Sequence, residues 1–234
     1  SGEPMVLIHG IGSSRTIWDR VRVPLEERFD VIAVDLPGFG DQPWFGSPVP
    51  ERMESLATAV EEELDRLGIE RTHLVGHSMG GWIALELARR GRAIDVLAIA
   101  PVGGATEREA RASKRELART RFLARASTPV VGPITRSPQV RRLILKGSVR
   151  DPDLVDPVEL QASIGHLGRS VGFPKLLPDV CGPGDLIEGN LGDDMLSGGA
   201  GADTLVGGDG GYVIAADGAA GNRCRRPRRS RATN

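Results

Sequence analysis

Short apolar runs alternate with amphipathic patterns along the first hundred residues of the chain. Four runs, each closed by a nearby glycine or proline or by a polar stretch, predict buried strands at 5–9, 31–36, 72–76 and 94–100. Residues 55–67 carry leucines and a valine at helical spacing and are followed by Gly68, and residues 79–90 have a second helical pattern. Strands that alternate with helices predict a parallel sheet with right-handed crossovers, and therefore an α/β fold.

Residues 104–170 change character, because helical patterns follow one another there without a clear strand between them. The longest pattern, at 107–126, is rich in arginine, and shorter ones follow at 140–146 and 158–167. This order predicts a helical insertion that sits on the sheet domain. An exposed helical bundle would have the same pattern and would differ only in where it packs.

The composition fits one globular domain with an appendage of different character. The 234 residues are 40% hydrophobic with a net charge of −1, and no apolar run is long enough for a transmembrane helix. Two cysteines alone form neither a disulfide framework nor a zinc site. Residues 182–221 contain seven acids, no Lys or Arg and 13 of the 31 glycines, whereas residues 222–234 contain six arginines and no acid. This shift predicts a boundary near Cys181.

A serine between glycines follows the third predicted strand. Residues 76–80 read Gly-His-Ser-Met-Gly and stand between a strand and a helix, where a serine can project from a tight turn toward a base. Glycine at positions 76 and 80 would let the turn approach neighbouring backbone, and the start of the helix would present N–H groups to a developing negative charge. The alternative is a glycine-rich turn with an uninvolved serine.

Two further loops complete a pattern that resembles the α/β-hydrolase superfamily. Residues 9–14 read His-Gly-Ile-Gly-Ser-Ser after the first strand, and residues 35–40 read Asp-Leu-Pro-Gly-Phe-Gly at the end of the second. Together with the serine motif, they make the chain similar to lid-bearing esterases, C–C hydrolases and haloperoxidase-like enzymes over residues 5–180. The resemblance implies a parallel-sheet hydrolase core.

The resemblance also assigns roles to individual residues. It implies that Ser78 is the nucleophile and that the backbone N–H groups of Ile11 and Met79 form the oxyanion hole. It implies a core at residues 1–103 and a helical cap at residues 104–176 that shapes a site for a small ester-like molecule. A serine at this turn argues against haloalkane dehalogenases and epoxide hydrolases, which use aspartate there.

The chain departs from the family pattern at the general base. The family order is Ser, then Asp or Glu, then a late His, but no histidine follows His166. We expect His9 and His73 to be structural. We expect His77 to point away from Ser78, because adjacent side chains on a sharp turn diverge. His166 is a candidate substitute base, although packing within the helical insertion is the favoured role for it.

The acid and the edges of the sheet depart from the family as well. Asp194 is a candidate for the acid, but it also belongs to the glycine–aspartate repeat described below, which explains it better. The core is expected to lack both the first strands and the C-terminal strands of the family. Unpaired edges of this kind would favour self-association.

A glycine–aspartate repeat occupies the acidic segment at residues 189–215. Its period is nine, with glycine at positions 1 and 4, aspartate at position 6 and leucine at position 8, in two full units and an incomplete third. It closely resembles the calcium-binding nonapeptide of RTX proteins. The resemblance implies weak calcium ligation by Asp194 and Asp203, since Tyr212 stands where a third aspartate is wanted. The alternative is a flexible acidic linker, and the hydrolase itself is expected to need no cofactor.

The remaining segments add little chemistry. Residues 177–188 are interpreted as a junction and residues 216–234 as a basic, disordered tail. The tail does not by itself indicate nucleic acid binding, because arginine outnumbers lysine throughout the chain. We expect no membrane span and a cytoplasmic location for the hydrolase part, with secretion if the repeat is functional.

These observations predict a serine hydrolase that acts on an ester or a related acyl or C–C bond. Its turnover should be impaired, because the late histidine is missing. The alternative is a non-catalytic, hydrolase-derived fragment joined to a short calcium-binding repeat. The position of each imidazole relative to Ser78 separates the two hypotheses.

Overall fold

The computed structural model of the chain describes an α/β body and a series of short strands after it. The described residues are 2–41, 49–103, 107–146, 149, 151–181, 187–188, 194–198, 204–206, 212–216 and 223–225. The segments between the last five strands, with Asp203 among them, lie outside the described residues.

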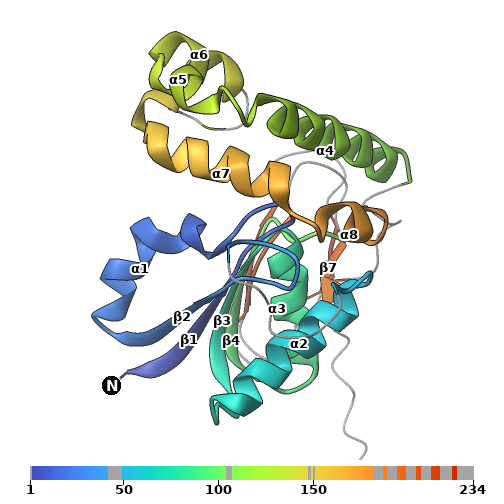
Figure 1. Cartoon of the computed structure of the whole chain (residues 1–234). Coiled ribbons are helices and arrows are strands. Elements are labelled where there is room, and N and C mark those ends of the chain that lie inside the picture. The colour runs from blue at the N-terminus through green and yellow to red at the C-terminus, as the bar shows by residue number, and fades with distance from the viewer. Residues whose placement is uncertain are drawn as a thin grey trace, which may run out of the picture.

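Parallel strands form the centre of the molecule (Figure 1). The first four strands, in the spatial order β2-β1-β3-β4, are β1 (Glu3–Ile8), β2 (Phe29–Val34), β3 (Thr72–His77) and β4 (Ala93–Ile99). Every neighbouring pair among them is parallel. All four strands predicted from the apolar runs are therefore present, in an α/β fold with a parallel sheet.

Strand β1 is buried on both faces, which explains its unbroken apolar sequence. Side chains alternate between the two faces of a strand. Val6 and Ile8 belong to the larger core cluster on one face, and Met5 and Leu7 belong to a smaller cluster on the other. The sheet is therefore the middle of three layers.

Three helices cover the face with the larger core. They are α2 (Met53–Arg66), α3 (Met79–Arg89) and α8 (Phe173–Val180). Helix α2 turns Leu56, Val60 and Leu64 inward at a spacing of four residues, which is the apolar stripe predicted from the sequence. Helix α3 packs directly on β3 and β4, and this packing holds the first residue of α3 at the carboxyl edge of the sheet.

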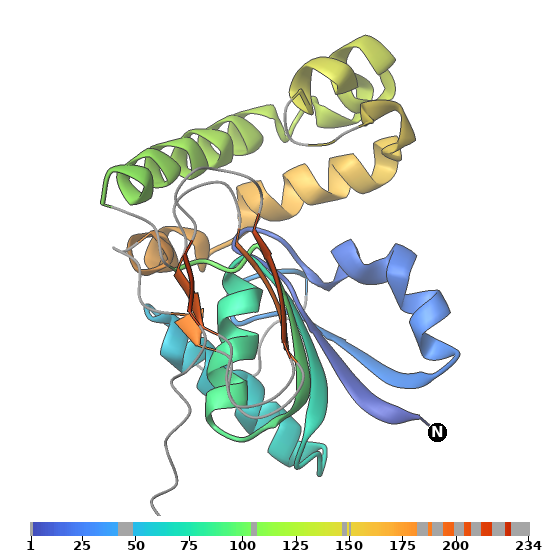
Figure 2. The same ribbon diagram turned by 180° about the vertical axis from the view of Figure 1, so that it is seen from behind.

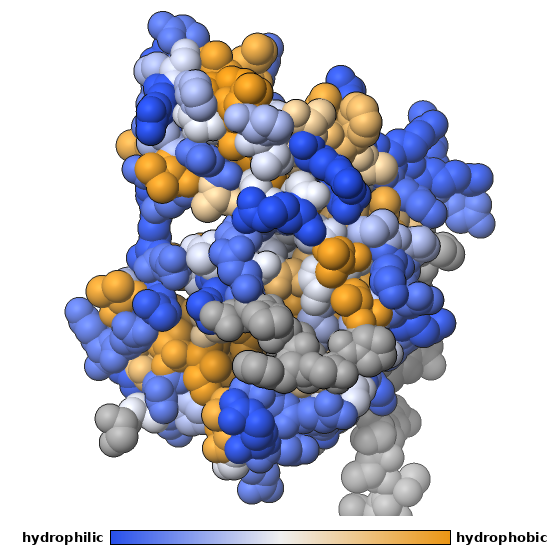
Figure 3. Space-filling model, in the orientation of Figure 1, coloured by the Kyte–Doolittle hydropathy of each residue, from blue (hydrophilic) through white to orange (hydrophobic). Residues whose placement is uncertain are grey.

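The opposite face is covered by η1 (Arg15–Trp18) and α1 (Asp19–Glu26). Trp18 is buried here with Met5 and Leu7, whereas α1 itself has no buried residue. Val21 and Val23 of α1 are exposed, and apolar side chains gather over this helix on the visible surface (Figure 3). This layer is therefore thinner than the layer of α2, α3 and α8.

A helical layer lies across the carboxyl edge of the sheet, at the top of Figure 1. It consists of α4 (Glu107–Ser127), α5 (Val131–Arg136), α6 (Pro138–Ile144), η2 (Pro152–Leu154) and α7 (Pro157–Arg169). Helix α7 packs against both α4 and α5, and its start is capped by Asp156, which accepts hydrogen bonds from the N–H groups of Val158 and Glu159 at 2.7 and 3.1 Å. The helices expected in this part of the sequence are thus present, and the division into domains at 103 and 176 stays a prediction.

Five short strands follow the helices and alternate between two sheets. They are β5 (Ile187–Glu188), β6 (Asp194–Gly198), β7 (Thr204–Val206), β8 (Tyr212–Ala216) and β9 (Arg223–Arg225). Strands β6 and β8 continue the central sheet beyond β4, while β5, β7 and β9 form a sheet of their own. Figure 2 shows these late strands on either side of α3. The sequence predicted that the sheet lacks C-terminal strands, but backbone pairing from the repeat occupies that edge.

The other edge of the sheet agrees better with expectation. Strand β2 is the outermost strand on that side, and no described residue pairs with its outer edge. The first strands of the family are therefore missing from the described part of the chain. Among the described helices, none combines the length and apolar character needed to cross a membrane.

Candidate active site

Ser78 lies at a sharp turn between β3 and α3. Strand β3 ends at His77, helix α3 begins at Met79, and Ser78 between them has φ 56° and ψ −120°. Apart from glycines, Ala100 is the one other described residue with positive φ. Backbone conformations of this kind are strained and occur at functional sites, where the surrounding structure holds them in place.

Glycine is required on both sides of Ser78. A Cβ atom on Gly76 would collide with the carbonyl of Gly80, and a Cβ atom on Gly80 would collide with the carbonyl oxygen of Ile8. Both obstacles are backbone atoms, which cannot turn away as a flexible side chain can. The close approach that the sequence predicted at these two positions is therefore present.

Hydrogen bonds fix the turn to the end of β4. The N–H of Ser78 donates to the carbonyl of Ile99 at 2.9 Å, and the N–H of Val102 donates to the carbonyl of Ser78 at 3.3 Å. The same Ser78 carbonyl also accepts from Gly81 at 2.9 Å within the first turn of α3. These bonds stabilise the strained conformation of Ser78.

His9 organises the loop that faces Ser78. Its ring is fully buried, Nδ1 donates to the carbonyl of Gly10 at 2.8 Å, and Nε2 accepts from the N–H of Leu36 at 3.0 Å. These partners require the neutral ring with its proton on Nδ1. Burial lowers the pKa of His9 to about 4. His9 is therefore a structural residue, as expected, and has no free nitrogen for proton transfer.

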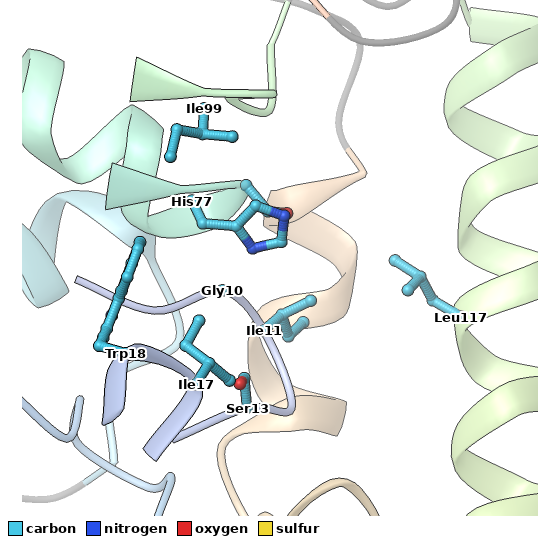
Figure 4. A pocket seen from close by; sticks show the side chains of 9 residues that line it. Gly10, Ile11, Ser13, Ile17, Trp18, His77, Ile99 and Leu117 are labelled. Atoms are coloured by element: carbon cyan, nitrogen blue, oxygen red, sulfur yellow. The ribbon is translucent and has the colours of Figure 1, made fainter. Parts of the chain in front are cut away.

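A cavity of about 470 Å³ opens beside Ser78 (Figure 4). The residues that line it are mostly apolar and come from the 9–14 loop, η1, the ends of β3 and β4, and α4: Gly10, Ile11, Ser13, Ile17, Trp18, His77, Ser78, Ile99 and Leu117. Figure 4 shows Leu117 reaching toward the cavity from α4, on the side opposite Trp18. Among the described residues, no carboxylate or ammonium group lines this space.

The backbone N–H groups of Ile11 and Met79 are the oxyanion donors that the resemblance implies. Met79 is the first residue of α3, and the first N–H groups of a helix have no acceptor within it. Ile11 lines the cavity, and in the described part of the chain its N–H donates to no backbone carbonyl. The catalytic role of both N–H groups stays a prediction.

The expectation that His77 points away from Ser78 is wrong, because both residues line the same cavity. Gly10 is the physical reason. A Cβ atom built on Gly10 would lie 3.0 Å from Cβ of Ser78 and 3.4 Å from Nδ1 of His77, so the missing side chain leaves room for both. Burial lowers the pKa of His77 below its ordinary value.

His73 and His166 lie elsewhere. His73 is near the start of β3, at the opposite end of the strand from Ser78, and its ring contacts Asp95 at 2.8 Å and Glu3 at 3.2 Å. His166 is buried in α7 with Nδ1 3.6 Å from a carboxylate oxygen of Asp41, too far for a hydrogen bond, and it does not line the cavity. The structure therefore does not bring His166 to Ser78.

Asp194 lies three positions back from the carboxyl edge of the sheet. It begins β6 and pairs with Val96, three positions before the pair of Ser197 with Ile99 at the cavity wall. Its role as the acid stays a prediction. Within the described ranges, no group of three potential ligands is arranged to hold a metal ion, and Asp203 lies outside those ranges.

A parallel sheet with a strained serine at a strand-to-helix turn defines the class of α/β proteins with a nucleophile elbow. The model of the alpha/beta hydrolase family matches residues 5–182. The chain belongs to the alpha/beta hydrolase family.

Curated relatives and solved structures are similar to parts of this chain. An epoxide hydrolase of Mycobacterium tuberculosis is 61% identical over 51 residues, which are 22% of this chain and 24% of that protein. A pimeloyl-[acyl-carrier protein] methyl ester esterase of Aeromonas hydrophila is 37% identical over 87 residues, 37% of this chain and 32% of the esterase. The matches span about a third or less of these relatives.

The structural comparison shows the fold. A thermophilic esterase from Thermogutta terrifontis superimposes with a TM-score of 0.59 at 21% identity, and the match covers 93% of this chain and 82% of the esterase. This chain therefore shares the fold of that structure over most of its length.

Proposed function

We propose that this protein is a serine hydrolase that acts on an ester or a related acyl or C–C bond. The observation that carries the proposal is the strained Ser78, which lines an apolar cavity at the start of α3. Membership of the alpha/beta hydrolase family supports it. The curated relatives differ in reaction, and serine at the turn favours acyl chemistry over the aspartate-based opening of epoxides.

The geometry suits attack of a serine on a carbonyl carbon. As Ser78 Oγ bonds to that carbon, negative charge develops on the carbonyl oxygen, and in this proposal the N–H groups of Ile11 and Met79 stabilise that charge. One such donor is worth on the order of 10²–10³ in kcat. The positive end of the α3 dipole points at the same place and adds to this stabilisation.

The lining of the cavity indicates the substrate. Ile11, Ile17, Trp18 and Ile99 present apolar groups, and Leu117 closes the space from α4. The substrate is therefore a small neutral ester with an apolar acyl group, because a charged group would lose its hydration without a partner. In this proposal the helical layer acts as a cap that shapes the site.

Turnover by this site is low. The sequence has no histidine after His166, and no carboxylate of the described residues lines the cavity to orient an imidazole. Loss of triad members in serine hydrolases leaves a residual acceleration on the order of 10³–10⁴ over water, which binding and the oxyanion hole supply. We expect this protein to lie between that residual level and a complete triad.

Covalent labelling tests the proposal directly. A fluorophosphonate probe should modify Ser78, with the adduct located by mass spectrometry of peptides, and the same preparation should hydrolyse p-nitrophenyl acetate slowly. Both signals should disappear in Ser78→Ala and persist in Ser55→Ala, which removes an exposed serine of α2. Absence of the adduct in the wild type, or equal hydrolysis by Ser78→Ala, would favour the non-catalytic alternative.

A second candidate function, weak calcium binding by the repeat, is favoured by the register of the late strands. Asp194 in β6 pairs with Tyr212 in β8, and Ile187 in β5 pairs with Leu205 in β7, each eighteen positions later. Eighteen residues are two units of nine. The chain therefore returns to the same sheet after every two units, and each unit places one strand in one of the two sheets. This spacing supports a coil in which equivalent positions of the repeat stack, as the RTX resemblance implies.

A further inference from the structure

All four histidines of the chain lie in described residues, so the candidates for a proton acceptor can be compared completely. His9 uses both ring nitrogens within its own loop, and His73 contacts two carboxylates at the far end of β3. His166 is buried in α7 and does not line the cavity. His77 alone shares the cavity with Ser78.

The imidazole of His77 is available for proton transfer. No described residue hydrogen-bonds its ring, and Figure 4 shows the ring turned into the space above Gly10 and Ile11. Nδ1 of His77 and Cβ of Ser78 lie 3.4 and 3.0 Å from the same point beside Gly10. The ring and the serine side chain therefore border the same small space, which one water molecule can bridge.

We infer that His77 accepts the proton of Ser78, in place of the histidine that other members of this fold supply from the end of the chain. This inference rests on the proposed function, because it names the base of the same site. Its basis is geometric: a cavity shared by one serine and one unengaged imidazole, with the other three histidines placed elsewhere.

One imidazole is enough to carry every proton transfer of the reaction. As Ser78 Oγ attacks, the O–H bond breaks, its proton passes to the neutral ring, and the π electrons of the carbonyl move to oxygen. When that oxyanion collapses, the bond to the alcohol breaks and the imidazolium returns the proton to the departing oxygen. A water molecule then attacks the acyl-enzyme, gives its proton to the ring, and the acid leaves as Ser78 regains a proton.

The surroundings of His77 keep the ring neutral but do not orient it. Partial burial favours the neutral form, which is the form that accepts a proton, and lowers the pKa of His77. In the complete triad a carboxylate holds the imidazole and stabilises its charged form. In the part of the chain that the structure describes, no carboxylate lines this cavity, so the charged ring gains no such stabilisation from it and the rate is lower.

Steady-state kinetics with short p-nitrophenyl esters test this inference. His77→Gln should lower kcat by on the order of 10²–10⁴ with little change in KM, because general acid–base catalysis contributes that range. The rise of kcat/KM with pH, which ionisation of His77 produces, should disappear in the variant. His73→Gln makes the same chemical change at the far end of β3 and should retain kcat/KM when assayed below its unfolding temperature.

Chemical rescue of His77→Ala by imidazole, together with the variant His166→Gln, separates a role of His77 from the alternatives. Added imidazole should restore part of the activity of His77→Ala, since the cavity then has room for a free ring, but should not restore Ser78→Ala. Unchanged kcat and pH profile in His77→Gln would overturn the inference, and their loss in His166→Gln would assign the role to α7. If the probe modifies Ser78 of the wild type but His77→Gln keeps its kcat, the inference about His77 fails and the proposed function stands. If the probe does not modify Ser78 of the wild type, both the proposed function and the inference about His77 are refuted.

Discussion

Gly80 offers a sharp test of how the serine turn is built. A Cβ atom at this position would collide with the carbonyl oxygen of Ile8 and lie 2.6 Å from that of His9, both in the backbone that leads from β1 into the cavity loop. Gly80→Ala must therefore push α3 away from β1, and overpacking of this kind costs roughly 1–3 kcal/mol. The gain in helix propensity from glycine to alanine, about 1 kcal/mol, offsets only part of the cost.

The same substitution at a second helical glycine separates the cost of the backbone collision from the gain in helix propensity. Gly132 also lies within a helix, α5, but a Cβ atom there meets only the end of the Gln161 side chain, at 3.2 Å, which can move aside. Urea unfolding followed by circular dichroism should show Gly80→Ala less stable than the wild type and Gly132→Ala as stable or up to about 1 kcal/mol more stable. Labelling of Ser78 should slow only in Gly80→Ala. Equal stability of the two variants would refute the argument that backbone contact requires glycine.

Two further predictions concern charge. Burial opposes the charged form of His73, but its hydrogen bonds to Asp95 and Glu3 outweigh burial and raise its pKa. The stability lost in His73→Gln should therefore be largest at about pH 5, below the ordinary pKa of histidine near 6.5, and should shrink as the pH rises through the raised value. Calorimetry should show weak calcium binding, in the range of roughly 10⁻⁴–10⁻³ M, that is lost in Asp194→Ala/Asp203→Ala. A loss of stability in His73→Gln that stays constant between about pH 5 and 9 would contradict the first prediction. Identical calcium titrations of the wild type and Asp194→Ala/Asp203→Ala would contradict the second.

The first hundred residues could be interpreted from local signals alone. Buried parallel strands leave continuous apolar runs such as that of β1, and the helical stripe of α2 repeats every turn. The serine turn was equally visible, because the glycines that it needs stand within two residues of Ser78 in the sequence, although Gly80 makes room for the distant backbone of Ile8. Local patterns and tertiary structure agree in this region.

The position of His77 could not be read in the same way. Its direction depends on Gly10, which lies in the loop after β1 and leaves the space that the ring enters. The pairing of β6 with β4 depends on a register between residues about a hundred positions apart. Backbone hydrogen bonds set that register without any mark in the apolar pattern, since glycine-rich strands specify pairing weakly.

Ile99 connects the repeat to the site, which leads to a last prediction. Its carbonyl accepts the hydrogen bond from Ser78, its side chain lines the cavity, and its backbone pairs with Ser197 of β6. Leu196→Pro removes a ladder donor in the middle of that pairing and should loosen the end of β4. The rate at which a fluorophosphonate labels Ser78 should then fall.

Leu205→Pro is the matched control, because Leu205 occupies the equivalent position of the next repeat unit but lies in β7, whose sheet does not pair with β4. Both substitutions place a proline in a strand that has a partner on each side, so a general effect on the repeat would be the same in the two variants. A slower labelling of Ser78 in Leu196→Pro alone would mean that β6 supports the serine turn through Ile99. Equal rates in both variants and the wild type would mean that the turn is held by β1, β3 and α3 without help from the repeat.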